Sequence, residues 1–238
     1  MRRTELPTGD VVVTLLGQEG KWRAVARKGK LIGGNLGKLS LFHDVTVQHY
    51  TRPGQDDLAL ITQVQLNGAL PRLSDPEVYP YAHVLAELTD KLAVDVHLDS
   101  GFYHYFAGAL RGVAQHPDPE QVALVMSWRL LAQGGLTPRL TRCARCGDRN
   151  PSGGDLSGSV FFDVSAGGLS CAACSSGFRL DPSVRDDLLA LHRSTVAAAL
   201  ELPFSERRAH WALLSRYLGF HIGEVQSLRH LPRTPEPV

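Results

Sequence analysis

Residues 11–66 alternate apolar and polar positions in short runs that glycines and prolines separate. Four runs are rich in β-branched or aromatic residues: VVVTLL (11–16), KWRAVAR (21–27), HDVTVQHY (43–50) and LALITQVQL (58–66). Alternation of this kind predicts strands with one buried face. In KWRAVAR it places Trp22, Ala24 and Ala26 on one face, while the charged side chains lie on the other face or in the turn. Four or five short strands favour a small β barrel, because closure removes exposed sheet edges.

The period changes after residues 71–80, PRLSDPEVYP, whose three prolines indicate a domain boundary. Apolar residues then recur at helical spacing, which predicts helices over 81–94, 100–116, 117–135, 184–202 and 205–219. Asp181 and Pro182 are predicted as the N-cap and first residue that lead into the fourth of these. The predicted fold class is therefore α+β and multidomain. An oligonucleotide-binding (OB) fold barrel is expected at residues 1–78 and an α-helical domain at 79–238, with a cysteine-bearing insert at 142–177.

All the cysteines lie in that insert, as two C-x-x-C pairs: Cys143 with Cys146, and Cys171 with Cys174. The N-terminus lacks a secretory signal, and no apolar run approaches the roughly 18 residues of a membrane helix. We therefore expect a cytoplasmic protein without membrane contact, in which paired cysteines bind metal rather than form disulfides. The predicted cofactor is one Zn²⁺ ion held by four thiolates, with a short hairpin in the spacer 157–169. The 24 residues between the pairs exceed the usual spacing of about 15–20.

This zinc ion is expected to be structural. Four thiolates close the coordination shell, whereas a catalytic zinc keeps one position open to water. No histidine is followed at the second position by glutamate, as a nucleobase deaminase requires, and no H-E-x-x-H occurs. GGNLGKLS (33–40) resembles a phosphate-binding loop but lacks its first glycine and its Ser or Thr after the lysine. The sequence therefore favours a protein that is not an enzyme.

The net charge is only +1, but basic residues gather near the N-terminus. No acidic residue lies between Glu19 and Asp44, and the basic residues there are Lys21, Arg23, Arg27, Lys28, Lys30 and Lys38. Such a stretch is typical of a surface that binds a polyanion. Trp22 within it suits either base stacking on single-stranded nucleic acid or the barrel core, and both roles stay open. Arg207, Arg208 and Arg216 on a late helix either extend this track or are simply solvated.

Several stretches resemble the RecO family of bacterial recombination mediators. They are GDVVVTLLGQEGKWRAVARKGK (9–30), LAQGGLTPRLTRCARCG (131–147), GGLSCAAC (167–174) and YLGFHIGEVQSLRHL (217–231). The resemblance covers nearly the whole chain. Where the family often has a longer basic run after its Ala-Lys-Gly segment, this chain continues with LIGGNLG (31–37).

The resemblance implies a non-enzymatic DNA-binding protein of the RecF pathway with an N-terminal OB-fold barrel. Such proteins bind single- and double-stranded DNA and anneal complementary strands. With the partner RecR they help the RecA recombinase to displace single-strand-binding protein, whose acidic C-terminal tail docks on the helical domain. The expected location is the cytoplasm, in association with the nucleoid. Two alternatives remain: a zinc-dependent enzyme that processes nucleic acid, and a protein-interaction module without DNA binding.

Overall fold

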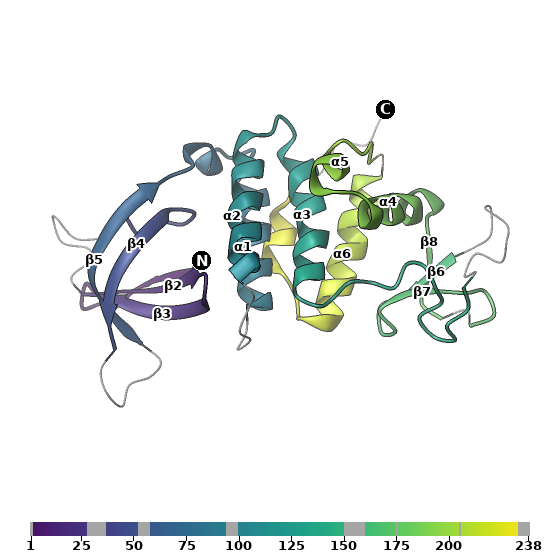
Figure 1. Ribbon diagram of the computed structural model, residues 1–238, viewed down its shortest axis with the longest axis horizontal. Coiled ribbons are helices and arrows are strands. Elements are labelled where there is room, and N and C mark those ends of the chain that lie inside the picture. Colours follow the sequence, from purple (N-terminus) through teal and green to yellow (C-terminus); the bar gives the residue numbers. More distant parts are fainter. Residues whose placement is uncertain are drawn as a thin grey trace. The chain divides into compact units, whose positions relative to one another are not determined.

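The computed structural model describes residues 2–27, 37–51, 58–93, 100–149, 160–174, 176–204 and 206–232. The chain divides into two compact units, Met1–Pro117 and Asp118–Val238. The first unit holds a five-stranded sheet and two helices, and the second holds the other helices and the cysteine insert (Figure 1). The domain boundary expected after residue 78 stays a prediction; α1 begins at Tyr79, inside the first unit.

The sheet of the first unit follows the order β1-β2-β3-β5-β4. Its strands are β1 (Arg2–Glu5), β2 (Val11–Gly17), β3 (Gly20–Ala26), β4 (Asp44–Tyr50) and β5 (Ala59–Gly68). All neighbours are antiparallel except β3 and β5, which are parallel. This crossover agrees with the Greek-key, partly open barrel of the expected fold. In the described residues no pairing joins β1 to β4, so closure of the barrel is not seen.

The predicted strand alternation is confirmed in β3. Ala24 and Ala26 are buried in the core of the sheet, and Trp22 packs against that core. Arg23, on the opposite face of the strand, is exposed. β1 is not predicted from the sequence, because four residues of mixed polarity give no clear alternation.

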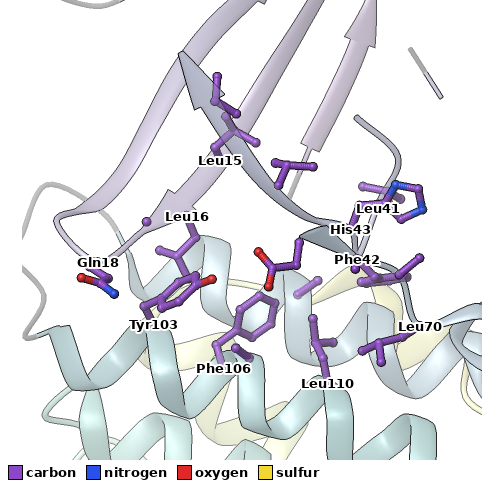
Figure 2. A pocket seen from close by; sticks show the side chains of 18 of the residues that line it. Leu15, Leu16, Gln18, Leu41, Phe42, His43, Leu70, Tyr103, Phe106 and Leu110 are labelled. Atoms are coloured by element: carbon purple, nitrogen blue, oxygen red, sulfur yellow. The ribbon is translucent and has the colours of Figure 1, made fainter. Parts of the chain in front are cut away.

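Two helices complete the first unit: α1 (Tyr79–Leu92) and α2 (Ser100–Gln115), after the short 3₁₀ helix η1 (Pro71–Ser74). Arg72 of η1 donates to the carbonyl oxygens of Ala114 and His116, at 3.2 and 3.1 Å, and so ties η1 to the end of α2. A pocket of about 460 Å³ lies between the sheet and these helices (Figure 2). None of the helices in the described ranges combines the length and the apolar character needed to cross a bilayer.

The second unit is built around α3 (Pro119–Gln133), in which every residue from Gln121 to Trp128 is buried. A helix that is buried on all sides lies at the centre of its domain. Around it are α4 (Pro182–Arg193), α5 (Val196–Leu200), α6 (Arg207–His221) and the 3₁₀ helix η2 (Gln226–His230). Arg129 of α3 donates to the carbonyl oxygens of Leu191, at 2.6 Å, and Ser194, and thereby satisfies the end of α4.

The prediction of one continuous helix over 184–202 is wrong, because the structure has two helices there, α4 and α5. The backbone is extended at Ser194, and the hydroxyl of Thr195 accepts a hydrogen bond from the amide of Ala198 at 3.2 Å. This N-cap starts α5 as a separate helix, because Ser and Thr side chains compete with helical hydrogen bonds at such positions. The predicted hairpin in the cysteine insert is confirmed: β6 (Val160–Asp163) pairs antiparallel with β7 (Gly168–Ser170), and also with β8 (Phe178–Leu180).

Candidate metal centre and nucleic-acid interface

The structure brings the four cysteines into one cluster. Their sulfur atoms all lie within 4.8 Å of one another, and the Cys146 and Cys171 sulfurs are 3.7 Å apart. Cys143 and Cys171 are buried, Cys174 is half-buried and Cys146 is exposed. Four soft ligands at these separations could hold one metal ion, with one edge of the site facing solvent.

Each cysteine pair is shaped by a tight turn. In the first, the amide of Gly147 donates to the carbonyl oxygen of Cys143 at 3.0 Å, and Gly147 has a φ of 79°, which glycine adopts without strain. In the second, the amide of Cys174 donates to the carbonyl oxygen of Cys171 at 3.1 Å. The two turns are linked because the amide of Cys171 donates to the sulfur of Cys143 at 3.4 Å.

Crowding of the thiols governs their ionisation. Burial opposes ionisation of Cys143, but hydrogen bonds from backbone amides, including those of Cys146 and Cys171, outweigh it and lower its pKa to about 6. Contacts with the Cys146 and Cys171 side chains raise the pKa of Cys174 to about 12. Four thiolates so close together repel one another without a cation, so a metal ion is the natural counter-charge for this cluster.

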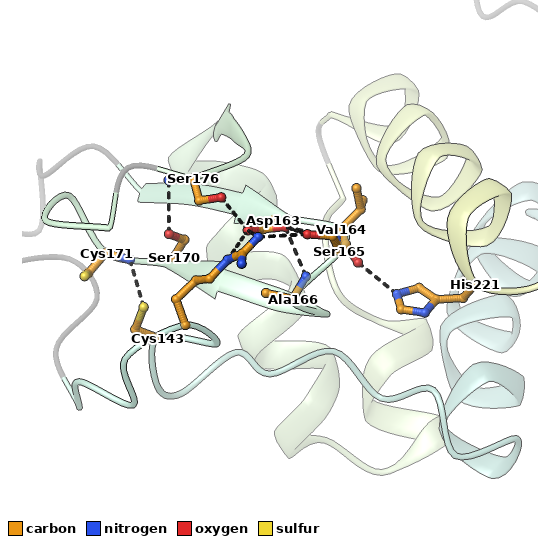
Figure 3. Close-up of polar contacts among 10 residues, drawn as sticks. Cys143, Asp163, Val164, Ser165, Ala166, Ser170, Cys171, Ser176 and His221 are labelled. Carbon is orange, nitrogen blue, oxygen red and sulfur yellow. Dashed lines mark hydrogen bonds and ion pairs between the residues drawn. The ribbon is translucent and has the colours of Figure 1, made fainter.

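Asp163, at the end of β6, organises the module around the cysteines (Figure 3). One carboxylate oxygen accepts from the amides of Ser165 and Ala166, at 2.9 and 3.0 Å, and from the Ser165 hydroxyl at 2.7 Å. The other accepts from Arg145 at 2.7 Å and from the Ser176 hydroxyl at 2.6 Å. Arg145 lies inside the first cysteine pair and Ser176 follows the second, so one carboxylate ties both turns to the hairpin.

The Asp163 side chain is almost fully buried, at 4% exposure, yet it stays ionised. Burial favours the neutral acid, but the hydrogen bonds from Ser176, Ser165 and Arg145 outweigh burial and hold its pKa well below the usual range. Asp163 is not among the site residues predicted from the sequence. The signal was present in Asp163-Val164-Ser165, since aspartate before a serine at the second position favours a side-chain-capped turn.

The cysteine module is anchored on α6. The ring of Phe162 meets that of Tyr217 edge-on at 5.8 Å, and His221 lies 3.0 Å from the carbonyl oxygen of Val164. Arg216 stands over the ring of Phe178, 4.7 Å from its centre. Its guanidinium therefore packs on the module, and the suggestion that Arg216 extends the DNA track stays a prediction.

Arg207, a second candidate for that track, forms ion pairs with two acidic residues of the same unit. Its guanidinium pairs with Asp118 at 2.5 Å and with Glu120 at 3.4 Å. These contacts join the N-terminus of α6 to the first turn of α3.

The basic residues predicted near the N-terminus fall into three groups. Lys21 donates to Asp90 of α1, to the backbone oxygen at 2.7 Å and to the carboxylate at 3.2 Å, and Lys38 donates to the carbonyl oxygen of Val64 at 3.1 Å. Arg23 and Arg27 are exposed. Lys28 and Lys30 lie outside the described residues. Trp22 is half-buried and contacts His49 at 4.6 Å between ring centres.

The outer face of the sheet carries a row of side chains that crosses all five strands. Backbone pairing aligns Thr4, Val12, Val25, Leu60 and Tyr50 in this outer row. The three aliphatic members are half-buried, and Tyr50 is 44% exposed. Arg23 precedes Val25 by two residues and shares its face. The row could not be read from the sequence, because the strand register that aligns it is a tertiary feature.

The sequence is similar to known proteins over most of its length. A sequence model of the family described as Recombination protein O C terminal matches residues 73–231, more than half of the chain. This region contains helices α1 to α6 and all four cysteines. The DNA repair protein RecO of Bifidobacterium adolescentis is 33% identical over an alignment of 179 residues that covers 73% of this chain and 70% of that protein.

Proposed function

The chain belongs to the RecO family, and from this premise we propose that it is a non-enzymatic DNA-binding protein of recombinational DNA repair. It binds single- and double-stranded DNA in the nucleoid and anneals complementary strands. With RecR it helps to load RecA onto DNA coated by single-strand-binding protein, whose tail docks on the helical domain. The alternatives are an enzyme that processes nucleic acid and a protein-interaction module that does not touch DNA.

The outer face of the sheet is the observation that carries this proposal. Val12, Val25 and Leu60 form an apolar strip that ends at the exposed ring of Tyr50. Arg23 lies beside this strip, and Arg27 follows at the end of β3. Aromatic and apolar surface receives bases while arginines follow phosphates, which is how single strands are bound without sequence preference.

The proposed DNA contacts are those predicted from the sequence, with different roles. Arg23, Arg27, Lys28 and Lys30 neutralise phosphates. Lys21 and Lys38 are held by acceptors of the chain itself, so we assign them a supporting role in which they fix β3 and the segment before β4. Annealing follows if neutralisation lets two strands approach on one surface.

The metal ion we propose is a single structural Zn²⁺. Tetrahedral zinc with bonds of about 2.3 Å to sulfur separates its ligands by about 3.8 Å, close to the 3.7 Å between Cys146 and Cys171. Four thiolates leave no position for water, so the ion holds the module together and does not activate a nucleophile. An oligonucleotide turnover that Cys171→Ser abolishes in a folded protein would favour the enzyme alternative instead.

Titration of single-stranded DNA at several salt concentrations tests the function. The wild-type affinity should fall steeply with salt, because phosphate contacts release counterions. In the double variant Arg23→Gln/Arg27→Gln, the slope of log affinity against log salt should shrink by about 1.4, from about 0.7 for each lost contact to a single strand.

The matched control is Arg193→Gln, an exposed arginine of α4 in the second unit, which should keep the wild-type slope. An unchanged slope in the double variant would remove the outer face as the binding surface. No binding by the wild-type protein at low salt would leave the protein-interaction module as the better description.

A further inference from the structure

The pocket of the first unit is separate from the outer face of the sheet. It is lined by the β2–β3 hairpin, by β4 and the residues before it, by residues 68–70 and by α2. Figure 2 shows Tyr103, Phe106 and Leu110 of α2 on one side and Leu15 and Leu16 of β2 on the other. A volume of about 460 Å³ is within the range of small-molecule sites, which is about 300–1,000 Å³.

The walls of the pocket are mostly apolar and aromatic. Leu15 and Trp22 pack on the core of the sheet from this side. The rings of Trp22, Phe42, Tyr103 and Phe106 all line the space. Several aromatic faces around one cavity suit a flat, polarisable ligand that can be stacked on both sides.

Two opposite charges and a hydroxyl group meet in the same space. Asp44 at the start of β4 and Arg111 of α2 both line the pocket. Both charges act on the phenol of Tyr103: its pKa is raised first by burial and then by Asp44, and Arg111 opposes this. In the described part of the chain Arg111 forms no ion pair, so its donors are available to a ligand.

Phe42 holds a strained backbone at the edge of the pocket. Its φ is 64°, and it is the only residue other than glycine with a positive φ in the described ranges. Edge-on contacts fix its ring, at 6.2 Å from Tyr79 and 5.4 Å from His83. Strain of this kind persists where the surroundings impose it, and it is concentrated at ligand sites.

We infer that this pocket takes one unstacked base of a bound DNA strand, and that guanine is the base it fits best. Guanine presents the O6 and N7 acceptors, which match the Arg111 guanidinium, and the N1–H and N2–H donors, which match the Asp44 carboxylate. Stacking on aromatic side chains with hydrogen bonds to the base edge is how proteins hold extruded bases. This inference rests on the proposed DNA binding.

A strand on the outer face reaches this pocket around the end of the β2–β3 hairpin. Arg23 and Trp22 are neighbours on β3 and point to opposite faces, so the sheet lies between phosphates beside Arg23 and the pocket wall. The tight turn of the β2–β3 hairpin, with Gln18, forms the rim between them. A strand on the outer face can therefore turn one base over this rim.

The test compares two single-stranded probes, an oligothymidylate and the same oligothymidylate with one central guanine. We expect the guanine probe to bind at least about fivefold tighter, which is the lower end of the discrimination that one bidentate contact to a base edge provides. Ala107→Phe fills the pocket from α2 and should abolish this difference without changing the salt slope. Arg111→Gln, a change of an exposed side chain that leaves the fold intact, should reduce the difference in the same way, and Arg193→Gln should not.

Binding of free nucleotides, measured by tryptophan fluorescence, is a second test that does not depend on the outer face. Guanosine monophosphate should quench the fluorescence of Trp22 more strongly than inosine monophosphate, which lacks the N2 amino group. Asp44→Asn should remove this preference, and Trp22→Phe identifies the signal among the three tryptophans of the chain.

The two ideas fail separately. If both oligonucleotides bind equally with the expected salt slope and neither nucleotide quenches, the pocket inference is wrong and the proposed function stands. If neither oligonucleotide binds but guanosine monophosphate still quenches Trp22, the pocket binds a nucleotide and the DNA-binding function is wrong.

Discussion

Removal of the metal ion, or Cys143→Ser, is expected to lower the midpoint of thermal unfolding by at least about 10 °C while DNA affinity at low temperature is nearly unchanged. Structural zinc contributes about 10–16 kcal/mol in small zinc peptides, and the loss of a few kcal/mol shifts a protein of this size by several degrees. The described residues of the module form three strands of three or four residues, so apart from the Asp163 hydrogen bonds and the contacts with α6, the metal ion is the main link between its turns. Circular dichroism and metal analysis of the same samples measure both effects.

The matched control is Ala173→Ser, which places the same hydroxyl between Cys171 and Cys174 at an exposed position that provides no ligand. It should keep both metal content and thermal stability. Return of zinc to the chelated protein should restore the original midpoint. A loss of DNA affinity in chelated protein that remains fully folded would show that the cysteine cluster acts on DNA, and that a purely structural role is wrong.

Local patterns predicted much of this molecule because they reflect local physics. The alternation in β3 correctly placed Ala24 and Ala26 in the core, since the two faces of a strand are fixed by backbone geometry. The spacing of the four cysteines predicted their clustering, because a tight turn presents both sulfurs of a C-x-x-C pair to one point. Asp181 and Pro182 marked the start of α4.

Contacts between distant residues could not be predicted in this way. The phosphate contact of Lys21 stays a prediction, but no local pattern indicated that its ammonium donates to Asp90, 69 residues further along the chain. The outer row depends on the register of five strands, and a shift of one residue would turn each side chain to the other face. Both features are set by tertiary packing, and hydrophobic periodicity carries no information about contacts between distant residues.

Asp163→Asn is expected to destabilise the protein by about 3–5 kcal/mol near neutral pH, because it removes a buried charge and places an amide donor where Arg145 and the Ser176 hydroxyl now find an acceptor oxygen. This corresponds to a fall of about 10 °C in the unfolding midpoint. Asp75→Asn, a change of an exposed aspartate in the first unit, is the control and should shift the midpoint by no more than a degree or two.

The pH dependence identifies the carboxylate as the cause. The pKa of Asp163 is lower in the folded protein than the unfolded value of about 3.9, so its stabilisation is complete above that value. As the pH falls below about 4, the unfolded chain takes up a proton first and the stabilisation is lost. The difference in unfolding free energy between wild type and Asp163→Asn should therefore be constant from about pH 5 to 7 and should shrink towards about pH 2, as denaturant titrations can measure. A difference that stays the same at low pH would mean that the variant acts through altered packing and that the charge of Asp163 has no part in holding the cysteine turns together.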